Sequence, residues 1–303
     1  MIRFENASFL IVGLVHNCEK ILKKSIIQIE KAFFSANKIN FLIIESDSSD
    51  KSAETLIQIS KNNDNFKYIL LGNMRYQYSK RTARMAYCRN QYLKLIDESP
   101  EYSNIDYVVV ADMDGVNSKI NEKSVKKCWD RVDWDVCTAN QSGPYYDIWA
   151  LRHHLWSPND CWEQARFLNI MGLSQFKSVL YSVYSRMVRI SPCSEWIEVE
   201  SAFGGLAIYR KEALLSVRYV GLRADGEEVC EHVSLHEQIR SKGGRIFINP
   251  GMINAGTVEH ARNITLHGLA RFWLGCRMRE LVCRIKFLPY LKKALDSIKY
   301  KSS

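Results

Sequence analysis

Two acidic side chains stand where they could share a metal ion. Asp112 and Asp114 come directly after residues 106–111, a short and strongly hydrophobic run. Such a run predicts a buried strand, and in open α/β sheets ligands bind at the carboxyl ends of the strands. Two carboxylates there suit Mn²⁺ or Mg²⁺, hard cations that prefer oxygen ligands and also bind phosphate oxygens. The pair predicts a metal site for a nucleotide diphosphate; the alternative is a solvated turn rich in aspartate.

A second polar segment follows the apolar residues 41–44. It contains Glu45 and Asp47, which can accept hydrogen bonds from a ribose or a base at the same sheet edge. His16 and Asn17, which follow the first apolar run, are assigned to the same donor site. The alternative for the second segment is a loop that only caps the next helix.

Basic side chains open the helix predicted after the third strand. Arg81 and Arg84 are one turn apart and share a face, and Arg89 follows on the same helix. Guanidinium groups match phosphate and carboxylate groups with two parallel hydrogen bonds, so Arg84 and Arg89 are candidates to bind the donor. A solvated basic face is the alternative.

Residues 143–152 mix aromatic rings with polar groups. Tyr146, Asp147, Trp149 and Arg152 suit a sugar, whose C–H faces pack on rings while its hydroxyls form hydrogen bonds. An aromatic loop that lines the core is the competing interpretation.

Two adjacent glycines lie in the predicted strand 202–209. Gly204 and Gly205 would let a ligand approach the backbone closely, and we assign them to the sugar and acceptor site. The structural alternative is a β-bulge.

The helix predicted from residue 231 begins with titratable groups. Glu231 can act as a catalytic base or bind acceptor hydroxyls, and His232 is assigned beside it as a catalytic residue. His232 and His236 are four residues apart, but the order His-Glu-x-x-His of a zinc protease is absent. His260 is the candidate third metal ligand, with His267 as a further one, although a lone histidine is more often structural.

Hydrophobic periodicity predicts strands that alternate with helices, and hence βαβ units around a largely parallel sheet. The predicted strands cover residues 9–15, 41–44, 66–71, 106–111, 136–139, 202–209 and 245–249, and the predicted helices cover 21–34, 52–60, 80–96, 156–187, 231–242 and 268–288. We expect one α/β domain over residues 1–267 and a basic C-terminal segment over 268–303.

The composition is that of an ordinary folded protein. Of 303 residues, 47% are hydrophobic and 25% are charged. The nine cysteines are scattered and form no CxxC pair, which argues against a disulfide framework and a structural zinc site and favours a reducing compartment. The first apolar run fits a strand better than a signal peptide, and no run reaches the ~18–20 residues that span a bilayer. We expect a cytoplasmic protein, peripheral to the membrane at most.

The ordered set of these segments resembles a GT-A glycosyltransferase, a Rossmann-like fold, over residues 8–255. It is most similar to the fungal capsule-associated α-mannosyltransferase family and to bacterial capsule or lipopolysaccharide glycosyltransferases. The resemblance implies that Asp112 and Asp114 bind the metal and that the segment from Glu45 to Asp47 contacts the nucleoside. This chain has Ala-Asp-Met-Asp where the fungal relatives carry Asn-Asp, so the identity of the donor is not transferred.

The resemblance also assigns roles to the remaining segments. It places Arg84, Arg89 and Asn90 near the donor, Tyr146, Asp147 and Trp149 in the sugar pocket, and Glu231 and His232 at the reaction centre. The implied activity is transfer of a hexose from a UDP- or GDP-sugar to a glycan or lipid-linked glycan acceptor at the cell surface.

The net charge of +9 suits an anionic partner. From Arg271 onward, nine Lys or Arg residues stand against Glu280 and Asp296, interspersed with apolar side chains. This pattern predicts an amphipathic basic helix on an anionic membrane surface. The alternative is a C-terminal helix packed on the domain with a solvated basic rim.

Two other functions remain open on the sequence. A nucleotidyltransferase can use a similar sheet and metal, but no glycine-rich basic loop follows the first strand to hold a triphosphate. A non-enzymatic basic module that binds membrane or nucleic acid would also explain the charge, but no nucleic-acid-binding motif is present, so we expect no nucleic-acid partner.

Overall fold

The computed structural model describes residues 2–262 and 266–284. The chain divides into two compact units. Unit 1 comprises Met1–Pro158 and Val188–Val258, and unit 2 comprises Asn159–Met187 and Glu259–Ser303. This division differs from the boundary expected after residue 267, because a segment from the middle of the chain belongs to unit 2.

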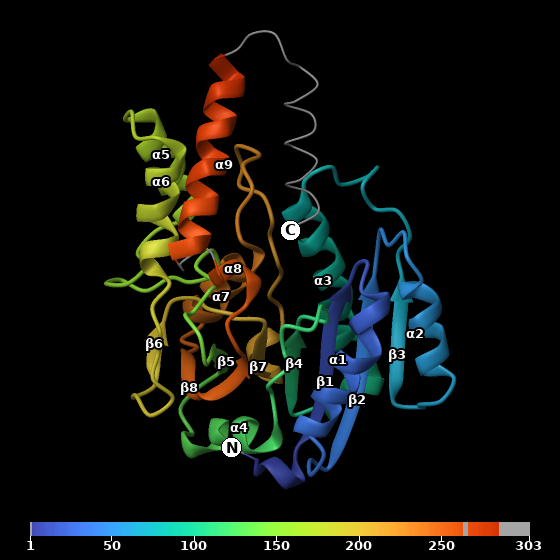
Figure 1. Cartoon of the computed structure of the whole chain (residues 1–303). Helices are drawn as coiled ribbons and strands as arrows, with labels where there is room; N and C mark the ends of the chain where they lie inside the picture. Colours follow the sequence, from blue (N-terminus) through green and yellow to red (C-terminus); the bar gives the residue numbers. More distant parts are fainter. Residues whose placement is uncertain (1, 263–265, 285–303) are drawn as a thin grey trace. The chain divides into compact units, whose positions relative to one another are not determined.

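Unit 1 contains an eight-stranded sheet with the order β3-β2-β1-β4-β7-β5-β8-β6 (Figure 1). Its strands are β1 (Ser8–Val15), β2 (Lys38–Glu45), β3 (Phe66–Leu70), β4 (Tyr107–Ala111), β5 (Val136–Gln141), β6 (Ile197–Val199), β7 (Leu206–Arg210) and β8 (Ile246–Ala255). Strand β7 is antiparallel to β4 and β5, and β6 is antiparallel to β8. The other pairs are parallel, so the predicted α/β class with a mostly parallel sheet is confirmed.

Helices flank this sheet within unit 1 and also make up unit 2. Unit 1 contains α1 (Glu19–Ala32), α2 (Ser52–Ser60), α3 (Arg81–Glu98), α4 (Glu122–Lys126) and α7 (Glu231–Ser241), and unit 2 contains α5 (Cys161–Ile170), α6 (Gln175–Ser182), α8 (Glu259–Arg262) and α9 (Leu266–Arg284). No helix in the described ranges is both long and apolar enough to cross a membrane.

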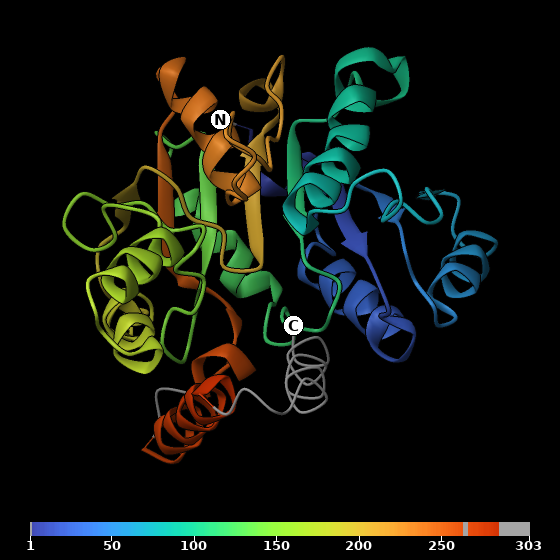
Figure 2. The same ribbon diagram turned by 90° about the horizontal axis from the view of Figure 1, so that it is seen from above.

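Both faces of the central strands are buried, which explains their continuous apolar sequence. On one face, Phe9 and Ile11 of β1 pack in a core with Leu22 and Ile26 of α1. Helix α3 contacts β1 and β2, and Figure 2 shows α1 and α3 on opposite faces of the sheet.

Two predicted elements differ in extent from the observed ones. The predicted helix 156–187 is two helices, separated by a turn at Gly172 with φ of +95°. Strand β7 begins at Leu206, because Gly204 and Gly205 before it have positive φ and leave the strand conformation. The pair therefore forms a turn before β7 and not the β-bulge given as the structural alternative, and its assignment to the sugar and acceptor site stays a prediction.

The short strand β6 and helix α4 were not predicted. The final predicted helix, 268–288, agrees with α9 up to Arg284, and its last residues lie outside the described part of the chain.

Candidate active site

The ends of three parallel strands bring the predicted site residues to one edge of the sheet. Val15 at the end of β1 is paired with Glu45 at the end of β2, and Val12 is paired with Val110 of β4. The polar residues that follow β1, β2 and β4 therefore share an edge, as the sequence predicted.

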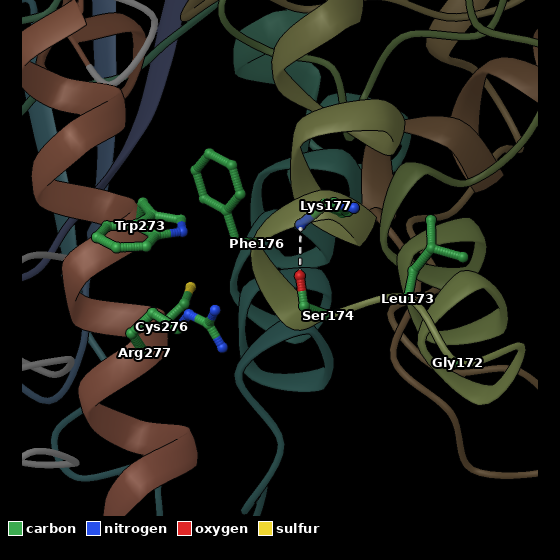
Figure 3. A pocket seen from close by; sticks show the side chains of 8 residues that line it. All are labelled: Gly172, Leu173, Ser174, Phe176, Lys177, Trp273, Cys276 and Arg277. Atoms are coloured by element: carbon green, nitrogen blue, oxygen red, sulfur yellow. Dashed lines mark hydrogen bonds between the residues drawn. The ribbon is translucent and has the colours of Figure 1, made fainter.

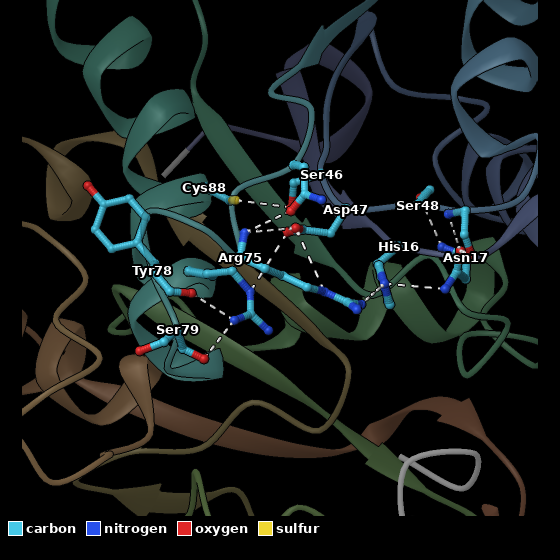
Figure 4. Close-up of polar contacts among 12 residues, drawn as sticks. His16, Asn17, Ser46, Asp47, Ser48, Arg75, Tyr78, Ser79 and Cys88 are labelled. Atoms are coloured by element: carbon cyan, nitrogen blue, oxygen red, sulfur yellow. Dashed lines mark hydrogen bonds and ion pairs between the residues drawn. The ribbon is translucent and has the colours of Figure 1, made fainter. Parts of the chain in front are cut away.

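The loops after β1 and β2 are bonded to each other. The Asn17 backbone N–H donates to Ser48 Oγ over 3.0 Å, and the Ser49 N–H donates to Asn17 Oδ1 over 2.8 Å (Figure 4). Glu45 is buried, and its Oε1 accepts from the Ser48 N–H. Glu45 thus holds the loop in shape, and the exposed polar atoms of His16 and Asn17 face the same region.

Asp47 lies at the centre of a second cluster. Its side chain is only 5% exposed, and its Oδ1 accepts from the Arg75 N–H over 2.9 Å. The guanidinium groups of Arg75 and Arg84 both approach its carboxylate to 3.8 Å. Arg84 also donates to the carbonyls of Tyr78 and Ser79, so it orders this loop as well as facing the edge.

Arg75 was missed by the sequence analysis, because it belongs to no recognisable motif. Its Nη2 lies 2.9 Å from His16 Nε2, and Asn17 Nδ2 lies 3.3 Å from the same nitrogen (Figure 4). Both partners are donors, so Nε2 of His16 acts as the acceptor and the ring proton sits on Nδ1. Burial and the Arg75 charge lower the pKa of His16, so the ring is neutral at pH 7.

Asp112 and Asp114 follow β4 with their side chains on the same side of the chain. Met113 between them is buried in the core, Asp114 is exposed, and Asp112 is partly exposed. The Asp114 Oδ1 accepts from the Val116 N–H over 3.1 Å, which leaves its second oxygen available. This alternation presents two carboxylates to one edge of unit 1.

Negative charge is crowded around Asp112. Burial and then the Asp114 carboxylate raise the pKa of Asp112 to about 8, although 35% of the side chain remains exposed. Asp147 and Glu231 add to this effect, and Arg89 opposes it. Such a set of carboxylates suits a divalent cation, which would compensate their charge.

No group of three His, Cys, Asp or Glu residues within the described ranges is arranged to hold a metal. Two carboxylates remain compatible with Mg²⁺ or Mn²⁺, because such ions commonly keep several waters and bind substrate phosphates. The side chain of His260, the predicted third ligand, lies outside the described residues, as does that of His267.

Arg89 connects the metal candidates to helix α7. It is 2% exposed; its Nε donates to Glu231 Oε1 over 3.2 Å, and its Nη2 lies 3.8 Å from Asp112 Oδ1. Its guanidinium also lies 5.6 Å from the ring centres of Phe203 and Tyr219. Among the residues that the structure describes, its buried Nη1 atom has no hydrogen-bond partner.

Glu231 and His232 are both buried at the start of α7. The ring of His232 stacks on Phe203 with centres 3.9 Å apart, and neither of its nitrogens has a hydrogen-bond partner within residues 2–262 and 266–284. Burial and the nearby Arg89 charge hold the pKa of His232 well below its usual value. The geometry therefore suits a neutral His232 and a Glu231 that is ion-paired with Arg89.

His236, one turn further along α7, is fully buried and bonded at both ring nitrogens. Its Nδ1 lies 2.9 Å from Ser201 Oγ, and its Nε2 lies 2.9 Å from the Tyr209 hydroxyl. Burial lowers the pKa of His236 to about 3. This histidine supports the helix that carries Glu231 and is structural.

Three buried amide side chains fix the turn at Gly204 and Gly205. Asn117 donates to the carbonyls of Asp112 and Gly205, each over 2.9 Å. Asn254 donates to Asn117 Oδ1 and to the Gly204 carbonyl, and Gln141 donates to the same carbonyl. No sequence pattern predicts this network, because its members are far apart in the chain.

The aromatic segment reaches the same place through Tyr146 and Asp147. Asp147 Oδ2 accepts from the Gly204 N–H over 3.0 Å. Burial, with the charges of Asp147, Asp112 and Asp114, holds the pKa of Tyr146 well above its usual value. The Tyr146 hydroxyl lies against Gly205, where a Cβ would be 2.9 Å from it. Arg152 donates to the carbonyls of Trp149 and Leu151, so it stabilises its own loop.

Comparison with known proteins gives fold-level neighbours only. No protein-family model and no curated protein sequence matches the chain. Among solved structures, S. aureus TarS 1-349 is 14% identical, with a TM-score of 0.47, over 92% of this chain and 76% of that one. The mannosyltransferase PcManGT from Pyrobaculum calidifontis, in complex with GDP-Man and Mn²⁺, is 13% identical, with a TM-score of 0.46, over 91% and 62%. Glucosyl-3-phosphoglycerate synthase from Mycobacterium tuberculosis, in complex with UDP, is 12% identical, with a TM-score of 0.42, over 82% and 69%.

We predict that Gly204→Ala destabilises the protein more than Gly226→Ala does. Both glycines have positive φ, which costs an alanine about 1–2 kcal/mol. A Cβ at Gly204 would also lie 2.9 Å from the Ala139 carbonyl oxygen, whereas nothing lies within 4 Å at Gly226. We expect about 1–3 kcal/mol of additional loss at Gly204, measured by urea unfolding. Equal losses in the two variants would contradict the close approach at this turn.

We also predict that acidification destabilises the fold through His236. Its pKa is about 3 in the folded protein and about 6.5 in the unfolded chain, so below pH 6.5 the unfolded chain binds a proton that the folded protein does not. The free energy of unfolding should therefore fall with decreasing pH, by about 1.4 kcal/mol per pH unit from this group. His236→Gln should show a shallower fall between pH 6.5 and 5. Identical slopes for the variant and the parent protein would rule this out.

Proposed function

We propose that this chain is a metal-dependent glycosyltransferase that transfers a hexose from a UDP- or GDP-sugar to a glycan acceptor. The observation that carries the proposal is the position of Asp112 and Asp114. They lie at the same sheet edge as the loops that follow β1 and β2, within one cluster with Arg89 and Glu231. This arrangement offers sites for a diphosphate, a nucleoside and a sugar side by side.

The nucleoside would bind against the loops after β1 and β2. His16 and Asn17 are exposed there, and the neutral His16 ring offers hydrogen-bonding atoms without a charge. Glu45 and Asp47 shape these loops and are themselves largely enclosed. Their role is therefore to preorganise the site, with Arg75 and Arg84 adding positive charge near the diphosphate.

Asp112 and Asp114 would hold Mn²⁺ or Mg²⁺. When bound, the ion would stabilise the negative charge that develops on the leaving diphosphate. Burial and then the neighbouring carboxylates raise the pKa of Asp112, and this crowding of carboxylates is the feature that fits a cation here. Arg89, which is buried, would orient Asp112 from the side of α7.

The sugar and the acceptor would lie near Tyr146, Asp147 and the Gly204–Gly205 turn. In the reaction the bond between the anomeric carbon and the diphosphate oxygen breaks, a bond to the oxygen of an acceptor hydroxyl forms, and the proton of that hydroxyl passes to the departing diphosphate. Glu231 is engaged by Arg89, so we assign it to positioning Arg89 in preference to removing the acceptor proton. A cytoplasmic role in capsule or lipopolysaccharide synthesis rests on the family resemblance alone.

The proposal predicts release of UDP or GDP from a sugar donor in the presence of Mn²⁺. The panel should include UDP-GlcNAc and GDP-Man, which are present in complexes of TarS and PcManGT. Removal of the metal with EDTA should abolish the release, and added Mn²⁺ should restore it. Release of pyrophosphate from a nucleoside triphosphate, with no donor turnover, would instead identify a nucleotidyltransferase.

Asp114→Ala is expected to lower this turnover by more than about 100-fold. Loss of a group that only supports a metal ligand costs up to about 100-fold, and Asp114 is proposed to bind the metal directly. The unliganded variant should unfold at the same temperature as the parent protein, because Asp114 is exposed. Asp64→Ala, at an exposed acid outside the site, is the matched control. An Asp114→Ala protein with full activity would refute the metal assignment.

A further inference from the structure

Almost all of the net positive charge of the protein belongs to unit 2. Its two segments, residues 159–187 and 259–303, contain thirteen Lys and Arg residues and five Asp and Glu residues. This gives unit 2 a formal charge of +8, out of +9 for the whole chain. The remaining 229 residues are nearly neutral in sum, so the net positive charge is concentrated in unit 2.

Unit 2 also exposes many large apolar side chains. Phe167 is 59% exposed, Ile170 81% and Leu281 56%. The set, drawn from α5, α6, α9 and the turn after α5, is Trp162, Phe167, Ile170, Met171, Tyr181, Trp273, Leu274, Met278 and Leu281. A concentration of exposed apolar groups in one compact unit marks an interaction surface.

Helix α9 carries apolar side chains on two sides, one packed inside unit 2 and the other exposed. On its inner side, Phe272 packs against Phe176 and Tyr184, with ring centres 5.6 and 5.3 Å apart. On its outer side, Leu274, Met278 and Leu281 recur at helical spacing and are exposed. Internal packing therefore accounts for the first set only, and the second set remains available to a partner.

A pocket of 540 Å³ lies between α6 and α9, within unit 2 (Figure 3). Its walls include the rings of Phe176 and Trp273 and the cationic side chains of Lys177 and Arg277. The Arg277 guanidinium lies 5.8 Å from the centre of the Trp273 ring. Aromatic surface beside two cations suits a ligand that has both an apolar and an anionic part, such as a phospholipid headgroup with the start of its acyl chains.

We infer that unit 2 is a docking module for the surface of an anionic phospholipid bilayer. The exposed aliphatic and aromatic side chains would enter the headgroup region, and the basic residues would lie against lipid phosphates. A nucleic acid would use the positive charge but not the exposed Leu274, Met278 and Leu281. This inference concerns a partner and does not depend on the proposed transferase activity.

The test is co-sedimentation of the full chain with vesicles. We expect binding to vesicles of equimolar phosphatidylglycerol and phosphatidylcholine, at least about tenfold weaker binding to phosphatidylcholine alone, and weakening with added salt. Absence of binding to the anionic vesicles, or equal binding to both kinds, would overturn the inference. Tighter binding to single-stranded RNA than to the anionic vesicles would overturn it as well.

Two pairs of variants locate the surface. Arg271→Glu with Arg277→Glu should weaken vesicle binding by at least about tenfold. Lys24→Glu with Lys61→Glu, which makes the same charge change on exposed residues of unit 1, should leave it nearly unchanged. Leu274→Ser with Leu281→Ser should weaken binding, whereas Phe34→Ser in unit 1, at a side chain 79% exposed, should not. Unit 2 variants that bind like their controls would refute the assignment.

Nucleotide binding with Mn²⁺, measured on the same proteins, separates this inference from the proposed function. Vesicle binding without any nucleotide binding would contradict the proposed transferase function and support the docking module. Nucleotide binding without vesicle binding would support the transferase function and contradict the docking module.

Discussion

The site depends on one electrostatic constraint, the crowding of carboxylates around the buried guanidinium of Arg89. Arg89 lies between Glu231 and Asp112, so it ties helix α3, helix α7 and the end of strand β4 to one another. A buried charge is tolerated only with partners, and removal of one member of such a pair typically costs about 3–5 kcal/mol. The aromatic rings of Phe203 and Tyr219 enclose the cation, which keeps water away and strengthens its interactions. One guanidinium facing several carboxylates leaves an excess of negative charge, and this excess is the physical reason for expecting a cation at Asp112 and Asp114.

A second constraint holds the backbone that carries these carboxylates. Asn117, Gln141 and Asn254 are buried, and the amide nitrogen of each donates hydrogen bonds that offset the cost of burying it. Their bonds go mainly to the carbonyls around the Gly204–Gly205 turn and to the carbonyl of Asp112. The turn is therefore fixed against the end of β4 by side chains that need not touch a substrate. Both residues of this turn have positive φ, which favours glycine. The pair therefore shapes the site through its backbone conformation and not through side chains.

The sequence predicts the first half of unit 1 well, because that half obeys simple periodic rules. Strands β1, β2 and β4 are continuous apolar runs, and α1 and α3 show helical spacing, so their type and position followed directly. Antiparallel β7 lies between β4 and β5 through long-range strand pairing, which no local sequence pattern predicts. The burial of Arg89 could be predicted from the sequence, because Arg89 lies on the same helix face as Ala86 and Leu93, which are also buried. The roles of Arg75 and of the buried amides Asn117, Gln141 and Asn254 could not be predicted from the sequence, because their contacts join segments that are far apart in the chain.

The separation of charge between the two units has a consequence for how a donor would be attracted. Residues outside unit 2 carry a net charge of only about one unit, so unit 1 has no strong overall positive field to draw in a nucleotide diphosphate. Within unit 1, the guanidinium groups of Arg75 and Arg84 beside Asp47 are the local positive charge at the sheet edge where the donor is proposed to bind. The basic residues of unit 2 occur together with exposed apolar side chains, and the proposed docking on an anionic bilayer accounts for both their charge and these apolar groups.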